Sequence, residues 1–366
     1  IINSCNLRCQ GCWVDVQAPR TMLTTDELDG IITDAKAHGN SFFGLLGGEP
    51  FLHPGLFDIL DRHGDCYFQI FTNGQLITPD VARRLARVGN ATPLISIEGD
   101  AATSDIRRGN RQVLDRTLRG LEVCVEARLL TGVATSLCQS NIDQLLTDAW
   151  LDRLIGLGVH YTWFHTYRPV GPEAAPELAL RPDQLVRVRE FVTSRRATKP
   201  IAIVDAYYDG EGEALCPMAA GITHHVGPSG YVEPCPIIQL AVDDARKGSF
   251  YDTVTKSAFL RDMRDAAAAH SRGCVMLENP RLVLEIADRH GARDTTQRGT
   301  AREELVAATP RSSQDLPGRE VPEKHWMYRL AKRHWFNDFG VYDQPAKRPV
   351  PRAGVEPPAP TESPTR

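Results

Sequence analysis

The sequence of 366 residues predicts an α/β fold, a partial (β/α)6 TIM-like barrel that is followed by a small cysteine-containing C-terminal extension. Apolar segments with strand character alternate with apolar residues at helical spacing, at intervals of about 25–35 residues, which is typical of parallel βαβ units. Glycine-rich and polar motifs come directly after several of these segments, where barrel folds place their active sites. Six such units, rather than eight, indicate an incomplete barrel.

The expected elements follow one another in a regular order. Thr24 and Glu27 form a T-x-x-E capping box at the start of the first expected helix, whose apolar residues recur at helical spacing. The first strand is expected around Ile1, where the sequence begins, and the other five are expected at residues 41–46, 67–71, 94–97, 131–137 and 159–167. Helices are expected between these strands, at residues 54–62, 81–88, 113–125 and 151–155.

Three cysteines stand close together near the start of the sequence, in the pattern Cys5-x3-Cys9-x2-Cys12. Three thiolates on one loop can bind three corners of a cubane iron–sulfur cluster, which leaves the fourth iron without a protein ligand. An iron with an open coordination position can bind and activate a small molecule. A structural zinc site is the alternative, although a zinc ribbon normally shows a second C-x2-C pair soon afterwards and the next cysteine is Cys66.

Further motifs follow the expected strands. They are Gly47-Gly48-Glu49-Pro50, Thr72-Asn73-Gly74, Ser96-Ile97-Glu98-Gly99 and Asp105-Ile106-Arg107-Arg108-Gly109. In the first of them, the glycines allow the backbone to approach a ligand closely and the carboxylate suits an ammonium group. Each motif alone is compatible with an ordinary β-to-α turn, but four of them in this order are not expected by chance.

In this order and spacing, the motifs resemble those of the radical S-adenosylmethionine (SAM) enzymes. The resemblance implies a [4Fe–4S] cluster on the three N-terminal cysteines, with S-adenosylmethionine bound to the open iron. It also implies cofactor contacts from Gly47, Gly48, Glu49, Thr72, Asn73, Ser96, Glu98 and Arg108. The sequence departs from the family pattern before the third cysteine, where an aromatic residue usually packs near the adenine. This position is Gly11, and Trp13 follows the cysteine instead.

A second group of cysteines lies in the expected extension. The pattern Cys216-x13-Gly230-x4-Cys235 resembles the opening of the SPASM and twitch extensions of this family, in which the glycine allows a tight hairpin. Only Cys274 follows downstream, so the resemblance implies one auxiliary iron–sulfur cluster on these three cysteines. Its fourth ligand would be missing, a residue other than cysteine, or supplied by the substrate. Three unpaired, buried cysteines are the alternative. The remaining three cysteines, at positions 66, 124 and 138, are expected in the core.

Aromatic and basic residues mark the expected substrate side of the barrel. Trp163, His165 and Tyr167 alternate along the last expected strand and should face the barrel interior, with Arg168 at the strand's C-terminal end. The histidine pair 224–225 comes just before the hairpin and could ligate the auxiliary cluster or contact substrate. For any single one of these residues, a surface or core role is the alternative.

The sequence divides into four expected regions. Residues 1–200 form the core, whose N-terminus we expect to be truncated because the chain begins with Ile1, and residues 201–300 form the auxiliary-cluster extension. Residues 301–344 are expected to be an aromatic and basic helical segment that docks on the core, and residues 345–366 a disordered proline-rich tail. The near balance of 42 basic and 46 acidic residues gives no reason to expect nucleic-acid binding. No apolar stretch is long enough to span a membrane, and the cysteine usage fits a reducing cytoplasm.

The resemblance implies a specific reaction. One electron from a flavodoxin or ferredoxin would cleave S-adenosylmethionine to methionine and a 5′-deoxyadenosyl radical, which would abstract hydrogen from a substrate. A peptide or protein is the expected substrate, and a small molecule in cofactor assembly is the alternative. A protein of another class, a non-catalytic iron–sulfur or zinc module for binding or electron transfer, would need neither the Gly47–Glu49 motif nor the Thr72–Gly74 motif.

Overall fold

The barrel consists of six parallel strands in one curved sheet. The computed structural model describes residues 1–332 apart from 206–207, 215, 222, 272 and 315. The strands are ordered β1-β2-β3-β4-β5-β6, and each pairs in parallel with the next. They are β1 (Phe42–Leu45), β2 (Tyr67–Thr72), β3 (Ala91–Ser96), β4 (Gly132–Leu137), β5 (Tyr161–Thr166) and β6 (Ala202–Val204). The predicted α/β fold with a partial barrel is confirmed.

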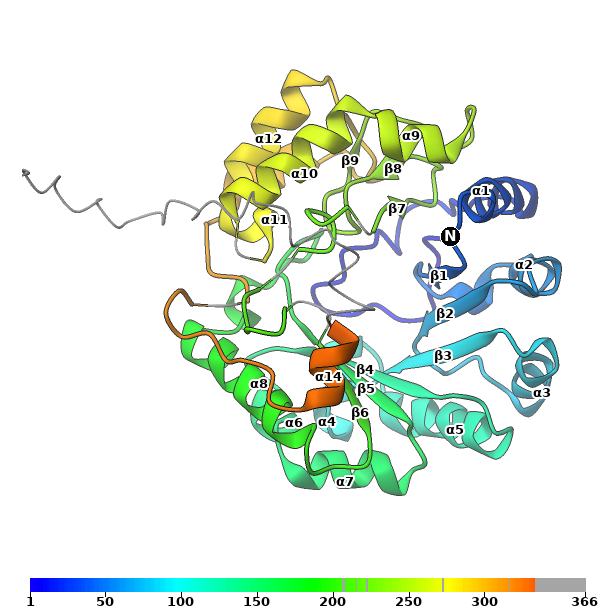
Figure 1. The fold of residues 1–366 in the computed structure, drawn as a ribbon. Helices are drawn as coiled ribbons and strands as arrows, with labels where there is room; N and C mark the ends of the chain where they lie inside the picture. The colour runs from blue at the N-terminus through cyan, green and yellow to red at the C-terminus, as the bar shows by residue number, and fades with distance from the viewer. Residues whose placement is uncertain (206–207, 215, 222, 272, 315, 333–366) are drawn as a thin grey trace, which may run out of the picture.

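Helices between the strands cover the outer side of the sheet (Figure 1). They are α1 (Thr25–Ala37), α2 (Leu56–Arg62), α3 (Pro79–Val88), α4 (Ala101–Arg108), α5 (Val113–Glu126), α6 (Ile142–Leu145), α7 (Asp148–Gly156) and α8 (Pro182–Arg195), with short 3-10 turns η1 (Pro50–Leu52) and η2 (Pro176–Leu178). The predicted capping box begins α1, because Thr24 Oγ1 accepts from the Glu27 amide and the Glu27 carboxylate accepts from the Thr24 amide. None of the described helices has both the length and the apolar character needed to cross a membrane.

The predicted number of strands is right, but the identity of one strand is wrong. Residues 1–4 do not form a strand of the sheet, since Ile2 makes only an isolated antiparallel bridge to Met22. This segment runs beside the residues that follow β1, where the Gly48 amide donates to the Ile2 carbonyl at 2.7 Å. The sixth strand is instead β6 at the opposite edge. Sequence periodicity missed β6 because three residues are too few to show alternation.

The main core lies between the sheet and its helices. Phe68, Ile70 and Leu121 are fully buried there, and the cysteines at positions 66, 124 and 138 are buried as predicted. At the N-terminal end of β5, the Tyr161 hydroxyl lies 3.1 Å from Gln69 Nε2 and 3.2 Å from Thr92 Oγ1. The predicted motifs come after β1, β2 and β3 and therefore lie at the opposite, C-terminal end of the barrel.

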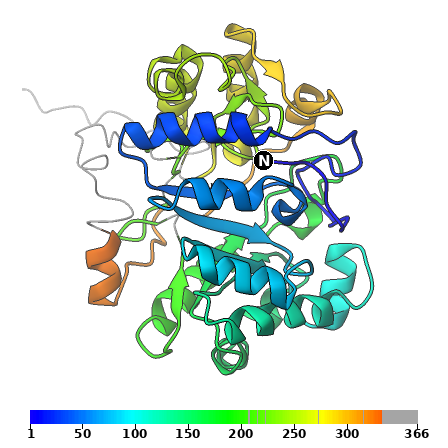
Figure 2. The ribbon, with the colours of Figure 1, turned by 90° about the vertical axis from the view of Figure 1, so that its right-hand side faces the viewer.

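Residues after β6 build a second group of elements above α1 (Figure 2). These elements are β7 (His225–Val226), β8 (Val232–Glu233), β9 (Leu240–Ala241), α9 (Phe250–Lys256), α10 (Ala258–His270), α11 (Val275–Glu278), α12 (Pro280–Arg289), β10 (Arg293–Asp294) and α13 (Ala301–Ala307). They share their own buried cluster, which includes Phe259 and Met263. The predicted hairpin is present, since β7 pairs antiparallel with β8 and Gly230 has a φ of 83°. Asp34 of α1 ties this group to the barrel by accepting from the Tyr251 amide at 2.7 Å.

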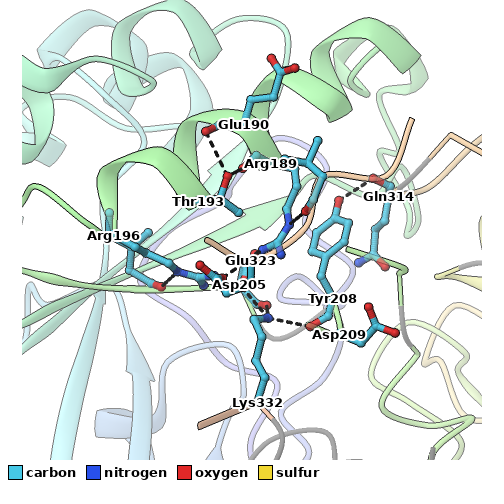
Figure 3. A network of polar contacts seen from close by, with 12 residues as sticks. Arg189, Glu190, Thr193, Arg196, Asp205, Tyr208, Asp209, Gln314, Glu323 and Lys332 are labelled. Carbon is cyan, nitrogen blue, oxygen red and sulfur yellow. Dashed lines mark hydrogen bonds and ion pairs between the residues drawn. The ribbon is translucent and has the colours of Figure 1, made fainter. Parts of the chain in front are cut away.

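The last described segment docks on the edge strand β6 through a buried ionic network (Figure 3). Arg196, just after α8, forms ion pairs with Asp205 and Glu323, and Lys332 Nζ lies 3.1 Å from Asp205 Oδ1. Helix α14 (Trp326–Ala331) contributes Tyr328, whose hydroxyl accepts from the Ile203 amide.

This docking differs from the predicted aromatic face with solvated lysines. Trp326 is 67% exposed, whereas Lys332 is buried. The buried Asp205 carboxylate explains the difference, because it offers the buried lysine a charged partner. The predicted residues 333–344 and the predicted tail 345–366 lie outside the described residues.

Candidate active site

The three N-terminal cysteines lie on one loop, residues 4–13, which we call the cysteine loop. Each of them is partly exposed. Cys5 Sγ accepts from the Leu7 amide at 3.4 Å, and Cys9 Sγ accepts from Arg108 Nη1 at 3.6 Å. Burial raises the pKa of Cys5 to about 11 and that of Cys12 to about 12, and the neighbouring Cys9 thiol adds to both shifts. The three thiols are therefore close enough to affect one another's charge.

This donor set fits an iron–sulfur cluster better than a single ion. No group of three or more His, Cys, Asp or Glu side chains in the described part of the chain is arranged to hold one metal ion. A cubane cluster binds each thiolate to a different iron, so the three sulfur atoms need not converge on one point. Hydrogen-bond donors already face two of the sulfurs, as a bound thiolate requires.

The C-terminal end of α4 holds the cysteine loop through hydrogen bonds. The Gln10 amide donates to the Arg107 carbonyl at 2.9 Å, and Arg107 Nη1 donates back to the Gln10 carbonyl at 3.2 Å. Gly109 has a φ of 62°, and a Cβ at this position would lie 2.1 Å from the Arg8 carbonyl oxygen. The Asp105 carboxylate accepts from the Gln112 and Val113 amides and so starts α5. The D-x-x-R-G motif is thus explained by contacts with the loop and the next helix.

A buried ion pair between Glu98 and Arg108 contacts the cysteine loop. Glu98 follows β3, and its Oε1 lies 2.5 Å from Arg108 Nη2. Burial opposes the guanidinium charge, but Glu98 and Cys9 outweigh it and raise the pKa of Arg108. Arg108 therefore stays charged while it contacts a cysteine sulfur.

Glu49 joins two of the motifs. Its carboxylate is fully buried and accepts from Thr72 Oγ1 at 2.7 Å, the Asn73 amide at 2.9 Å and the Phe51 amide at 3.3 Å. Burial raises the pKa of Glu49, although these three donors act in the opposite direction. The Asn73 side chain then donates to Asn6 Oδ1 at 2.7 Å, which links the ends of β1 and β2 to the cysteine loop.

The glycines of the GGEP motif meet another part of the chain. A Cβ on Gly47 would lie 2.5 Å from the Ile2 carbonyl oxygen, and one on Gly48 would lie 2.3 Å from the carbonyl oxygens of Asn3 and Ser4. Close approach of the segment that leads into the cysteine loop therefore requires both glycines. Their predicted contact with the cofactor stays a prediction. Ser96, the last residue of β3, is half-buried at the same end of the sheet.

Tyr167 is a site residue whose contact with the cysteine loop could not be foreseen from the sequence. A Cβ on Gly11 would lie 1.9 Å from its hydroxyl oxygen, so its ring packs directly on the loop. Gly11 has a φ of 67°, and the Arg107 guanidinium lies over the Tyr167 ring at 5.0 Å. The glycine in place of an aromatic residue was the one signal in the sequence. Trp13 faces the second group of elements, edge-on to His225 at 5.9 Å.

Trp163 and His165 of β5 lie together as predicted. Their rings stack with centroids 4.6 Å apart, and Phe71 of β2 lies 5.9 Å from Trp163. Burial, together with the charge of Arg168, lowers the pKa of His165 to about 3. This histidine is therefore neutral at physiological pH.

The three remaining candidate ligands, Cys216, Cys235 and Cys274, are called the auxiliary cysteines below. Burial, and next the Cys274 thiol, raise the pKa of Cys216. Burial raises the pKa of Cys235 well above its usual range, and the other two thiols add to the shift. The three thiols are therefore near enough to influence one another, and all three pack in the buried cluster of the second group of elements. The neighbouring His225 is engaged elsewhere, since its Nδ1 lies 2.6 Å from Glu233 Oε2.

Comparisons with family models and with curated proteins agree with one another. A model of the radical SAM superfamily matches residues 1–161. The AdoMet-dependent heme synthase of Methanosarcina barkeri is 30% identical over 165 residues, which are 44% of this chain and 47% of that protein. The mycofactocin maturase MftC of Mycobacterium tuberculosis is 27% identical over 293 residues, 74% of this chain and 72% of that protein.

A solved structure shares the fold. SuiB of Streptococcus suis, crystallised with the precursor peptide SuiA, has a TM-score of 0.60 at 17% identity, covering 72% of this chain and 64% of that chain. The matched part of the present chain thus spans about half the length of the heme synthase and less than two thirds of SuiB.

Proposed function

We propose that this chain, whose residues 1–161 match the model of the radical SAM superfamily, is an enzyme that cleaves S-adenosylmethionine reductively and abstracts hydrogen from a substrate. One observation carries the proposal. The cysteine loop is fixed against the C-terminal ends of β2 and β3 by Asn73 and by Arg108, which Glu98 holds, and these residues come from separate motifs. A non-catalytic iron–sulfur module would not need these motifs beside its cysteines.

In this proposal Cys5, Cys9 and Cys12 hold a [4Fe–4S] cluster. When bound, the cluster and S-adenosylmethionine supply the radical chemistry, and an electron donor of the flavodoxin or ferredoxin class supplies the electron. The chain itself binds and orients. Glu49 fixes the Thr72–Asn73 turn at the proposed cofactor side by accepting from Thr72 Oγ1 and the Asn73 amide.

We infer that the substrate is a peptide or protein. The similarity to a mycofactocin maturase and to the sporulation killing factor maturation protein of Bacillus subtilis over more than 70% of this chain supports this class. SuiB, which shares the fold, was crystallised with a precursor peptide. A tetrapyrrole is the second candidate, favoured by the similarity to heme synthases of two organisms.

We also propose an auxiliary cluster on the auxiliary cysteines. Its support is that the three thiols influence one another's ionisation and pack in the same apolar cluster of the second group of elements. Arg168, at the end of β5, lies near enough to influence both Cys216 and His165. In this proposal, the auxiliary site lies toward the barrel interior, where a substrate would meet the cofactor.

Release of 5′-deoxyadenosine tests the core proposal. Anaerobically reconstituted protein, incubated with S-adenosylmethionine and dithionite, should release it, and the Cys5/Cys9/Cys12 triple alanine variant should lose about four irons and all release. Cys66→Ala, which changes a buried cysteine far from the motifs, is the control and should keep both. Cleavage by the triple variant would refute the assignment of these cysteines. Stimulation of release by Fe-coproporphyrin III would favour the tetrapyrrole over a peptide.

A further inference from the structure

The cysteine loop has an uneven electrostatic environment. Cys5 Sγ receives neutral donors, the Leu7 amide at 3.4 Å and Asn73 Nδ2 at 3.9 Å. Cys9 Sγ instead receives the charged guanidinium of Arg108 at 3.6 Å. The other arm of that guanidinium is held by Glu98 at 2.5 Å. One of the cysteines is therefore linked to a cation, and that cation is linked to a carboxylate.

This ion pair is shielded from solvent. The Arg108 side chain is 15% exposed and the Glu98 side chain 5%. Salt and water screen such charges much less than surface charges. A change in either residue should therefore be felt at the sulfur of Cys9.

We propose that the Glu98–Arg108 pair sets the reduction potential of the cluster on Cys5, Cys9 and Cys12, with Arg108 favouring the reduced cluster through Cys9 and Glu98 limiting that effect. This inference rests on the proposed function. Reduction adds one electron, here from dithionite or a flavodoxin-class donor, and neither forms nor breaks a bond to the protein. The added negative charge is stabilised by a nearby cation and destabilised by a nearby anion. Hydrogen bonds to the cluster ligands also raise the potential.

The two residues should act with opposite signs. Arg108→Gln removes the cation and leaves Glu98 unpaired, so the potential should fall. Glu98→Gln removes the anion and leaves the cation at Cys9, so the potential should rise. A purely structural role, in which either change only loosens the loop, predicts shifts of the same sign or none. Arg108 is a positioning residue in this scheme, because it acts through Cys9.

The test is a redox titration followed by electron paramagnetic resonance of anaerobically reconstituted protein. At a fixed solution potential, Arg108→Gln should lower the ratio of reduced to oxidised cluster about tenfold, which is ~59 mV for a one-electron couple. Arg107→Gln is the matched control. It removes a cation from the same turn that is buried even more deeply than Arg108, but Arg107 donates to the Gln10 carbonyl and not to a sulfur, so a smaller shift is expected.

Iron content separates failure of this inference from failure of the proposed function. A wild-type protein without a reducible cluster would refute the proposed function. A normal cluster whose potential is unchanged in both variants, or shifted the same way by both, would refute the role of the ion pair. An equal shift from Arg107→Gln would refute the contact with Cys9 as its cause. If Arg108→Gln fails to hold iron, two other variants decide. Glu98→Gln should still raise the reduction potential, and Arg108→Lys should lower it by an intermediate amount, because lysine keeps the charge but cannot bridge both partners.

Discussion

Glu49→Gln replaces one oxygen of a buried carboxylate by an amide nitrogen. In the structure, Oε1 accepts from Thr72 Oγ1 and the Phe51 amide, while Oε2 accepts from the Asn73 amide. Whichever oxygen becomes the amide group, at least one backbone N–H then faces another donor. A buried donor left unsatisfied costs about 1–3 kcal/mol, so we expect the free energy of unfolding of the cluster-free protein to fall by about that amount.

Urea unfolding of the cluster-free protein measures this loss, with an unchanged slope against urea concentration. Glu27→Gln is the matched control. Glu27 also accepts a backbone amide, but glutamine serves equally well in a capping box, so the control should stay within about 0.5 kcal/mol of wild type. A loss from Glu49→Gln no larger than that of the control would refute the bracing role.

The same variant tests the predicted cofactor contact. If Glu49 also contacts S-adenosylmethionine, the affinity of the reconstituted variant should fall by about 1–3 kcal/mol, the scale of a lost charge-assisted hydrogen bond. A destabilised variant with an unchanged dissociation constant would leave Glu49 as a brace between two motifs and no more.

Three further predictions concern the auxiliary cysteines, the ionic network and the cysteine loop. Wild type reconstituted with excess iron should carry about eight irons, and the triple alanine variant of the auxiliary cysteines about four. The variant should still cleave S-adenosylmethionine in the absence of substrate. A wild type with only four irons would make these residues core cysteines. Burial opposes the charge of Asp205, but Arg196, Lys332 and Arg189 outweigh it and hold the pKa of this carboxyl well below its usual value of 3.8. The ionised carboxylate therefore stabilises the fold above pH 3.8, and this stabilisation is lost as the pH falls through the folded pKa. Asp205→Asn should cost about 3–5 kcal/mol at pH 7 and remove this part of the acid sensitivity, as unfolding at several pH values would show. Gly11→Ala should cost about 2–4 kcal/mol, from its left-handed backbone and the clash with Tyr167, and an unchanged stability would contradict that packing.

The parts of the fold that the sequence predicted depend on local signals. Five of the six strands, the capping box of α1 and the hairpin at Gly230 follow from periodicity and turn chemistry within a few residues. The strand β6 was missed because it is three residues long. The docking of Lys332 was missed because its partner Asp205 lies far away in the sequence.

The contrast between local signals and long-range contacts also applies to the candidate site. Which residues belong to it followed from motif order, but what they touch did not. The contact of Glu49 with the cofactor stays a prediction, and its observed partners, Thr72 and Asn73 of the next motif, could not be foreseen from the sequence. The packing of Tyr167 on Gly11 could not be foreseen either. Both contacts join segments whose relative position only the assembled sheet defines, so no local pattern could reveal them.

These contacts tie different positions of the cysteine loop to different strand ends. Asn73 reaches Asn6 and Cys5 from the end of β2, and Arg108 reaches Cys9 with the help of Glu98 at the end of β3. From beyond β5, Tyr167 packs on Gly11. A loop held at three points by the sheet has less freedom to lose when it binds a cluster, which favours binding. Asn73, Arg108 and Tyr167 would therefore support a bound cluster without binding its iron, because each of them fixes a position of the cysteine loop relative to a strand.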